Sequence, residues 1–127
     1  MLVNKNFSYI IKITLANKEN KENYYMKMNY MFHNKLCTEI EVDFQNKKVF
    51  IKNHTDDLID RAFGVIENPT YTDFEYFLER RCIPRTRDNL KWYLREIGLD
   101  FYDPLSIVYK TQGRMAEDHY WIDILDN

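Results

Sequence analysis

The chain has 127 residues, of which 45% are hydrophobic and 16% aromatic, and its formal net charge is −2. This length suits one domain with a single core, and this composition excludes an intrinsically disordered chain. The net charge excludes a polycation that would bind nucleic acid through its overall charge.

Cysteine and histidine usage indicates no metal site and no cofactor. Cys37 and Cys82 form no Cys-x-x-Cys pair, and His33, His54 and His119 are scattered along the chain. We therefore expect two free, buried thiols in a reducing compartment. No apolar run approaches the roughly 20 residues that span a bilayer, so we expect a cytoplasmic protein without a membrane segment.

Residues 1–27 are rich in Asn and Lys and differ in composition from the rest of the chain. The residues Lys21–Asn23 can be encoded by a purine-rich tract that resembles a bacterial ribosome-binding sequence, shortly before Met26 and Met28. Two interpretations stay open. Translation starts at one of these methionines and residues 1–25 are not made, or the chain begins with a strand and a polar tail.

From residue 28 to residue 54, apolar residues recur at every second position, which predicts a three-stranded antiparallel meander. We expect a tight turn with Asn34 at positive φ between the first two strands, and a second turn at residues 45–48. The inward-facing residues are expected to be Met28, Tyr30, Phe32, Ile40, Val42, Phe44, Val49 and Ile51. Glu39, Glu41 and Asp43 are expected to face outward.

A polar link, residues 57–69, leads to three short helices within residues 70–113, where the apolar period becomes 3.6. In the first helix, Thr72 and Glu75 are expected to form a capping box, and the buried face is Phe74, Phe77 and Leu78. Proline at position 84 is expected to stop this helix, because a proline ring cannot continue the hydrogen-bond ladder.

The second helix is predicted over residues 85–97, with a stripe of Leu90, Leu94 and Ile97. Gly98 followed by Leu99 is typical of a helix end. Asp103 and Pro104 predict the cap and the first residue of the third helix, whose buried face is Leu105, Ile107 and Val108 and which Gly113 closes. A final strand over residues 119–125 is expected to join the sheet. Short helices on one face of a small antiparallel sheet make an α+β domain.

Residues 80–95 hold six basic residues and one acidic residue, whereas residues 96–127 hold two basic and seven acidic. Three interpretations of this basic stretch stay open. It is the solvated side of two helices, a surface that docks an acidic or mixed protein, or a grip on nucleic acid. An internal role is a further alternative, in which Asp118 pairs with Arg81 or Arg87 through the fixed fork of the guanidinium group.

The segment from residue 77 to residue 124 resembles a segment of small standalone proteins from Firmicutes and their mobile elements, also found in some HipA-like serine/threonine kinase proteins. The resemblance depends on an Arg-x-x-Pro-x-x-Arg turn, a Gly-Leu pair, and a glycine followed by an aspartate and a Tyr-Trp pair. These positions are Arg81, Pro84, Arg87, Gly98, Leu99, Gly113, Asp118, Tyr120 and Trp121. The resemblance implies an accessory or regulatory module, anti-CRISPR-like factors among the possibilities. It does not imply kinase activity, because no glycine-rich phosphate loop and no HRD-like segment is present.

The only local clusters of titratable groups with a histidine lie at residues 54–57 and 117–119, and neither has the spacing of a known catalytic or metal-binding motif. We therefore expect a non-catalytic module that works by protein contact, with a nucleic-acid-binding regulator as the alternative. The candidate interaction residues are Arg81, Arg85, Arg87, Lys91, Trp92, Asp118 and Trp121. The protein partner and the oligomeric state are not defined by the sequence.

Overall fold

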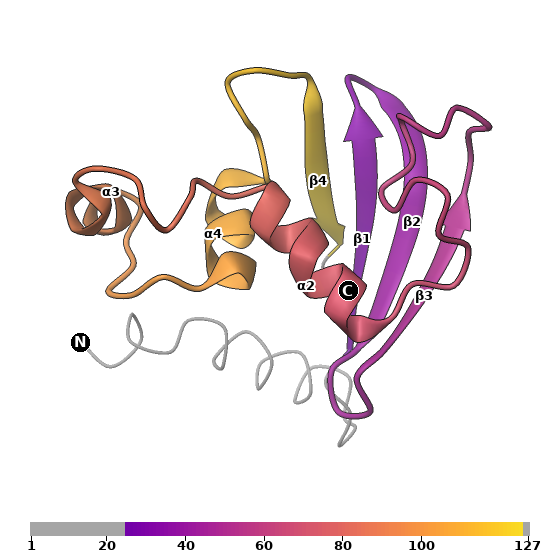
Figure 1. Ribbon diagram of the computed structural model, residues 1–127, viewed down its shortest axis with the longest axis horizontal. Coiled ribbons are helices and arrows are strands. Elements are labelled where there is room, and N and C mark those ends of the chain that lie inside the picture. Colours follow the sequence, from indigo (N-terminus) through magenta and orange to yellow (C-terminus); the bar gives the residue numbers. More distant parts are fainter. Residues whose placement is uncertain (1–24, 126–127) are drawn as a thin grey trace.

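The computed structural model describes residues 25–125, which form four strands and three helices (Figure 1). In chain order these elements are β1 (Tyr25–Phe32), β2 (Lys35–Asp43), β3 (Lys48–Asn53), α2 (Tyr71–Arg80), α3 (Leu90–Glu96), α4 (Pro104–Thr111) and β4 (Tyr120–Leu125). The strands form one antiparallel sheet in the order β3-β2-β1-β4. The predicted α+β class and the addition of the last strand to the sheet are confirmed.

The register of the sheet places the predicted apolar residues on one face. Met28 of β1 lies opposite Ile40 of β2 and Ile124 of β4, and Ile40 in turn lies opposite Ile51 of β3. A row of this kind crosses all four strands, because side chains alternate between the two faces with a period of two. Met28 and Ile40 are buried, so this face forms the floor of the core.

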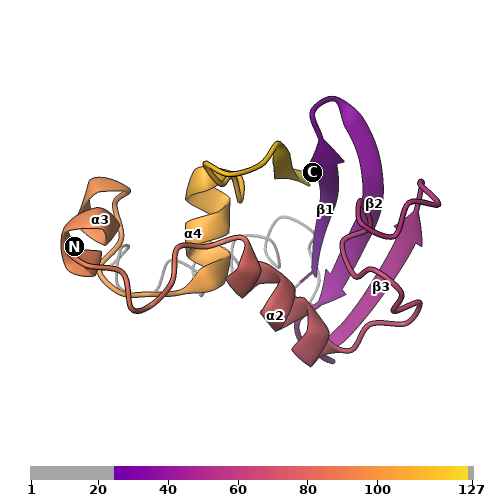
Figure 2. The ribbon, with the colours of Figure 1, turned by 45° about the horizontal axis from the view of Figure 1, so that its top comes forward.

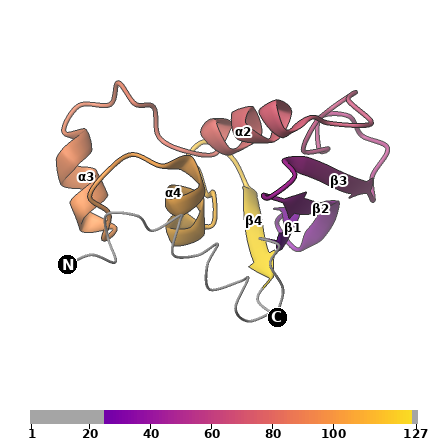
Figure 3. The same ribbon diagram turned by 90° about the horizontal axis from the view of Figure 1, so that it is seen from below.

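The helices follow one another away from the sheet. Figure 3 shows α2 lying across the sheet and α4 beside β4, whereas α3 lies farthest from the sheet, beyond α4 (also visible in Figure 2). The predicted buried face of the first helix is confirmed, since Phe74, Phe77 and Leu78 are all buried in α2. Helix α3 contributes one fully buried side chain, Leu94.

Two helix starts differ from the prediction. The cap of α2 is Thr70, whose hydroxyl accepts from the Asp73 amide while the Asp73 carboxylate accepts from the Thr70 amide. The capping box is therefore formed two residues earlier than the predicted Thr72 and Glu75. Helix α3 begins at Leu90, not at residue 85, because Asn89 adopts the left-handed conformation (φ 58°) and interrupts any helix before it.

The predicted end of α3 and start of α4 are confirmed. Gly98 has a φ of +86°, and the Leu99 amide donates to the Leu94 carbonyl at 2.7 Å, which buries Leu99 against the core. Asp103 caps α4 by accepting from the Ser106 amide, and Pro104 is the first helical residue.

Smaller differences fall at the turns. His33, not Asn34, has the positive φ (52°) in the turn between β1 and β2. Asp43 is buried, although it was expected to face outward, because its carboxylate accepts from the amides of Gln45 and Asn46 in the following turn. β1 begins at residue 25, inside the segment expected to be an extension. The hypothesis about the translation of residues 1–25 concerns residues that, apart from Tyr25, lie outside those the structure describes.

Candidate functional site

The side chain of Arg81 is the centre of a buried polar cluster. Its guanidinium donates twice to the Asp118 carboxylate, with both N···O distances 3.0 Å. It also donates to the carbonyls of Gly113 at 3.0 Å and Tyr120 at 2.8 Å. Arg81 is only 6% exposed, and a buried guanidinium needs such partners because losing its water shell is costly. The predicted internal pairing of Asp118 is therefore formed with Arg81, and not with Arg87.

The local sequence explains why this pair forms. Arg81 directly follows α2, and Gly113 follows α4 with a φ of +63°. A Cβ atom at Gly113 would lie 3.0 Å from Ile122 Cδ1 and 3.4 Å from Arg81 Cβ. Glycine at this position thus permits a conformation that other residues rarely adopt, and it also permits the close approach of β4 and Arg81.

The ion pair predicts acid-dependent stability. Hydrogen bonds from Arg81 lower the pKa of the Asp118 carboxyl below its usual value, with a further contribution from the Tyr120 amide. Because the pKa is lower in the folded state, the stabilisation is present above about pH 4, the unfolded value, and is lost as pH falls through the folded value. We expect the difference in urea midpoint between wild type and Asp118→Asn to shrink from pH 6 to pH 3. A difference that stays constant over this range contradicts this role of the ion pair.

Two other arginines of the basic stretch lie on tyrosine rings at the surface. We define the arginine corner as residues 81–89, the segment between α2 and α3. The Cζ atom of Arg85 lies 4.3 Å from the centroid of the Tyr102 ring, and that of Arg87 lies 4.7 Å from the Tyr93 ring. Both arginines are exposed. Stacking on an aromatic face holds a guanidinium in place without removing its hydrogen-bond donors.

The tyrosine rings are themselves fixed. The Tyr102 hydroxyl donates to the Ile83 carbonyl at 2.7 Å, which ties the arginine corner to the segment before α4. Burial raises the pKa of both Tyr93 and Tyr102, so these hydroxyls stay neutral around physiological pH. The arginine corner therefore holds Arg85 and Arg87 at the surface on two tyrosine rings, one of which is hydrogen-bonded to the corner itself.

Three further residues of the basic stretch are exposed, and one of them also makes a backbone hydrogen bond. Lys91 and Trp92 lie on α3 and are exposed, Trp92 by 58% of its surface. Arg80 is exposed as well, although its guanidinium donates to the Ala62 carbonyl at 3.3 Å. Arg87 lies before the start of α3 and therefore does not share a helix face with Lys91.

Asp118 and Trp121 lie apart from this surface. Trp121 is on β4, an edge strand that α4 separates from α3 (Figure 1). Its indole N–H donates to the His33 carbonyl at 2.7 Å, and the Arg114 guanidinium covers its ring at 4.6 Å. The candidate residues therefore fall into two groups. The first group is exposed on the arginine corner and α3 and consists of Arg85, Arg87, Lys91 and Trp92. The second group lies toward β4: the Arg81–Asp118 pair joins the end of α2 to the start of β4, and Trp121 lies on β4.

Two hollows lie next to these groups. A groove of about 410 Å³ runs between α2 and the start of α4, and its lining includes Arg85, Tyr102, Glu75 and Glu79. A second hollow of about 360 Å³ lies at the start of β4 and includes His33, His119 and Trp121. The imidazole rings of His33 and His119 are stacked there, with centroids 4.4 Å apart.

The two thiols are free and buried, as predicted. Burial raises the pKa of the Cys82 thiol to about 12 and also raises that of Cys37. A thiol with a raised pKa is a poor nucleophile at neutral pH, because the thiolate is the reactive form. Within residues 25–125, the structure brings together no group of three or more His, Cys, Asp and Glu side chains that could hold a metal ion.

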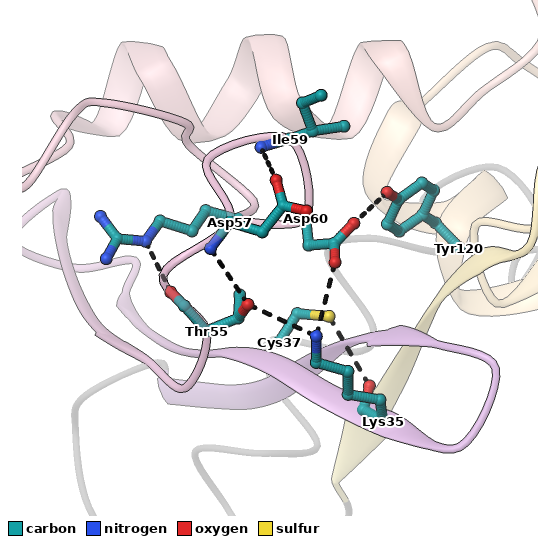
Figure 4. Close-up of polar contacts among 8 residues, drawn as sticks. Lys35, Cys37, Thr55, Asp57, Ile59, Asp60 and Tyr120 are labelled. Atoms are coloured by element: carbon teal, nitrogen blue, oxygen red, sulfur yellow. Dashed lines mark hydrogen bonds and ion pairs between the residues drawn. The ribbon is translucent and has the colours of Figure 1, made fainter.

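The sequence-based interpretation missed a structured loop. Residues 57–69, within the loop of residues 54–70 between β3 and α2, were expected to be a polar link, but Ala62 and Phe63 of this loop are buried in the core. In Figure 4, Asp60 accepts from the Tyr120 hydroxyl (2.5 Å) and from Lys35 (3.5 Å). The signal was present in the sequence, because six of the thirteen residues in "DLIDRAFGVIENP" are aliphatic or aromatic.

Comparisons of the chain with family models, with curated proteins and with solved structures found no match. In the part of the chain that the structure describes, no helix is long and apolar enough to cross a membrane. The fold and the site therefore define an α+β domain with an exposed arginine–tyrosine surface and, next to the start of β4, an ion pair between buried Arg81 and partly exposed Asp118.

Proposed function

We propose that this domain is a non-catalytic protein-interaction module, and that the arginine corner and α3 form its docking surface. The observation that carries the proposal is the pair of exposed arginines, Arg85 and Arg87, each stacked on a tyrosine ring. Arginine, tyrosine and tryptophan are the residues on which binding energy concentrates at protein interfaces, and Trp92 supplies the third type nearby in the chain.

Preorganisation supports the same proposal. A long side chain that is already held on a ring loses less conformational freedom on binding than a free one. The guanidinium groups of Arg85 and Arg87 keep the planar fork that recognises a carboxylate, so the partner we propose presents acidic residues around an apolar contact for Trp92.

A nucleic-acid partner is less well supported by this geometry. Arg81 is buried in an ion pair and is not available to a phosphate, and the acidic side chains of Glu75 and Glu79 line the groove beside Arg85. Salt-sensitive binding to random duplex DNA or RNA tests this alternative, because release of counterions makes affinity fall steeply with salt. We expect no measurable binding at 50 mM salt.

The resemblance to proteins of Firmicutes and their mobile elements refines the proposal. We infer that the partner belongs to a host defence or toxin system, whose activity this module modulates. The absence of a paired lysine and phosphate loop in the chain is the reason that we propose regulation by contact and not phosphoryl transfer.

Site-specific photo-crosslinking in cells that naturally make the protein tests the docking surface. A benzoylphenylalanine placed at Thr86, which is exposed between the two arginines, is expected to give a discrete protein adduct. Combining it with Arg85→Ala and Arg87→Ala should lower the adduct yield at least tenfold, because residues at the centre of an interface carry about 2 kcal/mol or more each.

The matched control places the same probe at Phe50, which is 52% exposed on β3 and far along the chain from the corner. We expect no adduct of the same mass from this position. Equal adduct yields with and without the two arginines, or crosslinks to nucleic acid alone, would contradict the proposal. The double variant should unfold within about 1–2 kcal/mol of wild type, since exposed cation–π contacts contribute about 0.5–1 kcal/mol each.

A further inference from the structure

The loop between β3 and α2, residues 54–70, exposes aliphatic side chains that the core does not use. The exposed fractions are 47% for Leu58, 82% for Ile59, 71% for Val65 and 40% for Ile66. Single exposed apolar residues are ordinary, but four within nine positions of one loop are a concentrated patch. This loop lies on the opposite side of the molecule from α3, so it is distinct from the arginine corner (Figure 1).

The two halves of the loop lie together. The Leu58 carbonyl oxygen is 3.9 Å from the position that a Cβ of Gly64 would occupy, so residues 58–59 come back beside residues 64–65. Gly64 has a φ of +56°, and the Ile66 amide donates to the Phe63 carbonyl at 3.0 Å, which closes the second half into a turn. The exposed aliphatic residues therefore flank the buried pair Ala62 and Phe63 on both sides.

Polar contacts hold this loop in one conformation. The Asp60 carboxylate accepts from Tyr120 on β4 and from Lys35 on β2, as Figure 4 shows. The Ala62 amide donates to the Thr38 hydroxyl at 3.1 Å, and the Arg61 Nε donates to the Thr55 carbonyl at 2.8 Å. The hydrogen bond to Asp60, followed by burial, raises the pKa of Tyr120, so this phenol keeps its proton and the contact at neutral pH.

The most exposed side chain of the patch, that of Ile59, points away from these contacts. In Figure 4 the side chain of Ile59 extends from the outside of the loop, while its amide donates to Asp57 at 3.0 Å. A loop that exposes apolar side chains while its backbone is fixed has already lost the freedom that binding would otherwise remove. The loop therefore presents its exposed aliphatic side chains on a backbone that hydrogen bonds already hold.

The charge around the patch is negative. Residues 54–70 contain Asp56, Asp57, Asp60 and Glu67 against one arginine, Arg61. The side chains of Asp56 and Glu67 are 111% and 75% exposed, and they lie 3.7 Å and 3.8 Å from the Arg61 guanidinium, which is itself only 16% exposed. A partner thus meets two exposed carboxylates that flank the mostly covered Arg61 guanidinium next to the aliphatic side chains.

We propose that this loop is a second docking surface, whose occupant is a protein segment with aliphatic side chains flanked by lysine or arginine. Burial of the aliphatic side chains supplies the affinity. Attraction between the carboxylates of the loop and the cations of the partner sets the orientation and the rate of association. This inference does not rest on the arginine corner, and either surface can fail without the other.

A titration with a defined probe tests the second surface. The probe is a fluorescein-labelled 14-residue helical peptide with one leucine face and one lysine face, and the matched control peptide has glutamate in place of lysine. We expect saturable binding of the lysine peptide to the full chain at low salt, with amide shifts in an NMR spectrum concentrated at residues 54–70. Ile59→Ser with Val65→Ser should raise its Kd at least tenfold, whereas Phe50→Ser on β3 should leave the Kd unchanged.

Asp56→Asn with Glu67→Gln provides an independent variant at exposed positions, and it should raise the Kd severalfold and weaken the salt dependence. Equal Kd values for all variants, equal binding of the glutamate peptide, no binding at all, or shifts centred on residues 81–95 would each overturn the proposal. Sedimentation of the protein alone is the final arm. A dimer that Ile59→Ser abolishes would assign this loop to a second copy of the chain and overturn the foreign partner.

Discussion

Arg81→Ala is expected to destabilise the domain by about 1.5–3 kcal/mol, because it removes the hydrogen bonds of a buried guanidinium, while the one-third exposed Asp118 side chain can be rehydrated. The substitution leaves the Asp118 carboxylate without its bidentate partner, and the carbonyls of Gly113 and Tyr120 without their donor. Those three groups lie on the segment that leads from α4 into β4. We therefore expect both a lower urea midpoint and faster amide exchange in β4, measured on the full chain.

The control is another arginine of the same basic stretch. Arg95→Ala removes an exposed charge on the last turn of α3, and we expect a change within about 0.5 kcal/mol. A loss of less than 1 kcal/mol for Arg81→Ala, similar to that of Arg95→Ala, would mean that the Arg81 contacts contribute little to the fold.

Phe77→Ala is expected to cost about 3–5 kcal/mol, because it removes a fully buried ring from the centre of the core. Phe77 is 1% exposed, and its ring centroid lies 5.2 Å from those of both Tyr30 on β1 and Phe63 in the β3–α2 loop. One side chain thus joins the sheet, the first helix and the loop. The free energy of unfolding from urea denaturation measures the loss.

The matched control is its neighbour in sequence, Tyr76, which is 60% exposed on the same helix. Tyr76→Ala should change stability by no more than about 0.5 kcal/mol, since alanine is also the better helix former. If the two substitutions have equal effects, Phe77 does not occupy the centre of the core and the packing described above is wrong.

Local periodicity was enough to predict the elements. Alternation at Met28 and Tyr30 identified the inner face of β1, because a period of two is a property of the backbone and not of distant contacts. Helix ends with strong local chemistry were equally readable, such as Gly98 after α3 and Asp103 before α4. These features depend on a few adjacent residues, which a sequence displays directly.

Features that depend on tertiary contacts were not readable in the same way. A stripe at 3.6-residue spacing cannot exclude helix before Leu90, where instead the left-handed Asn89 and the stacking of Arg87 on Tyr93 hold a turn. The link before α2 was predicted to be polar because of its acidic residues. The burial of Phe63 depends instead on a tertiary contact, the packing of its ring against Phe77 of α2.

The candidate site was predictable only in part. The chemistry of Asp118 required a cationic partner, but the choice between Arg81 and Arg87 depended on where the corner turns. The tyrosines beneath Arg85 and Arg87 come from two different segments, which no local pattern brings together. Trp121 was predicted as an interaction residue together with the arginines, yet it lies on the edge strand β4, apart from the corner.

The division of the basic stretch into a structural arginine and surface arginines depends on the Arg81–Asp118 pair. A double-mutant cycle with Arg81→Ala, Asp118→Ala and the combined variant, measured by urea denaturation at pH 7, tests that pair most directly. We predict a coupling free energy of about 1–3 kcal/mol between the two side chains. If the two single losses add to the double loss within about 0.5 kcal/mol, the two side chains are not coupled, and this contradicts a structural role for the Arg81–Asp118 pair.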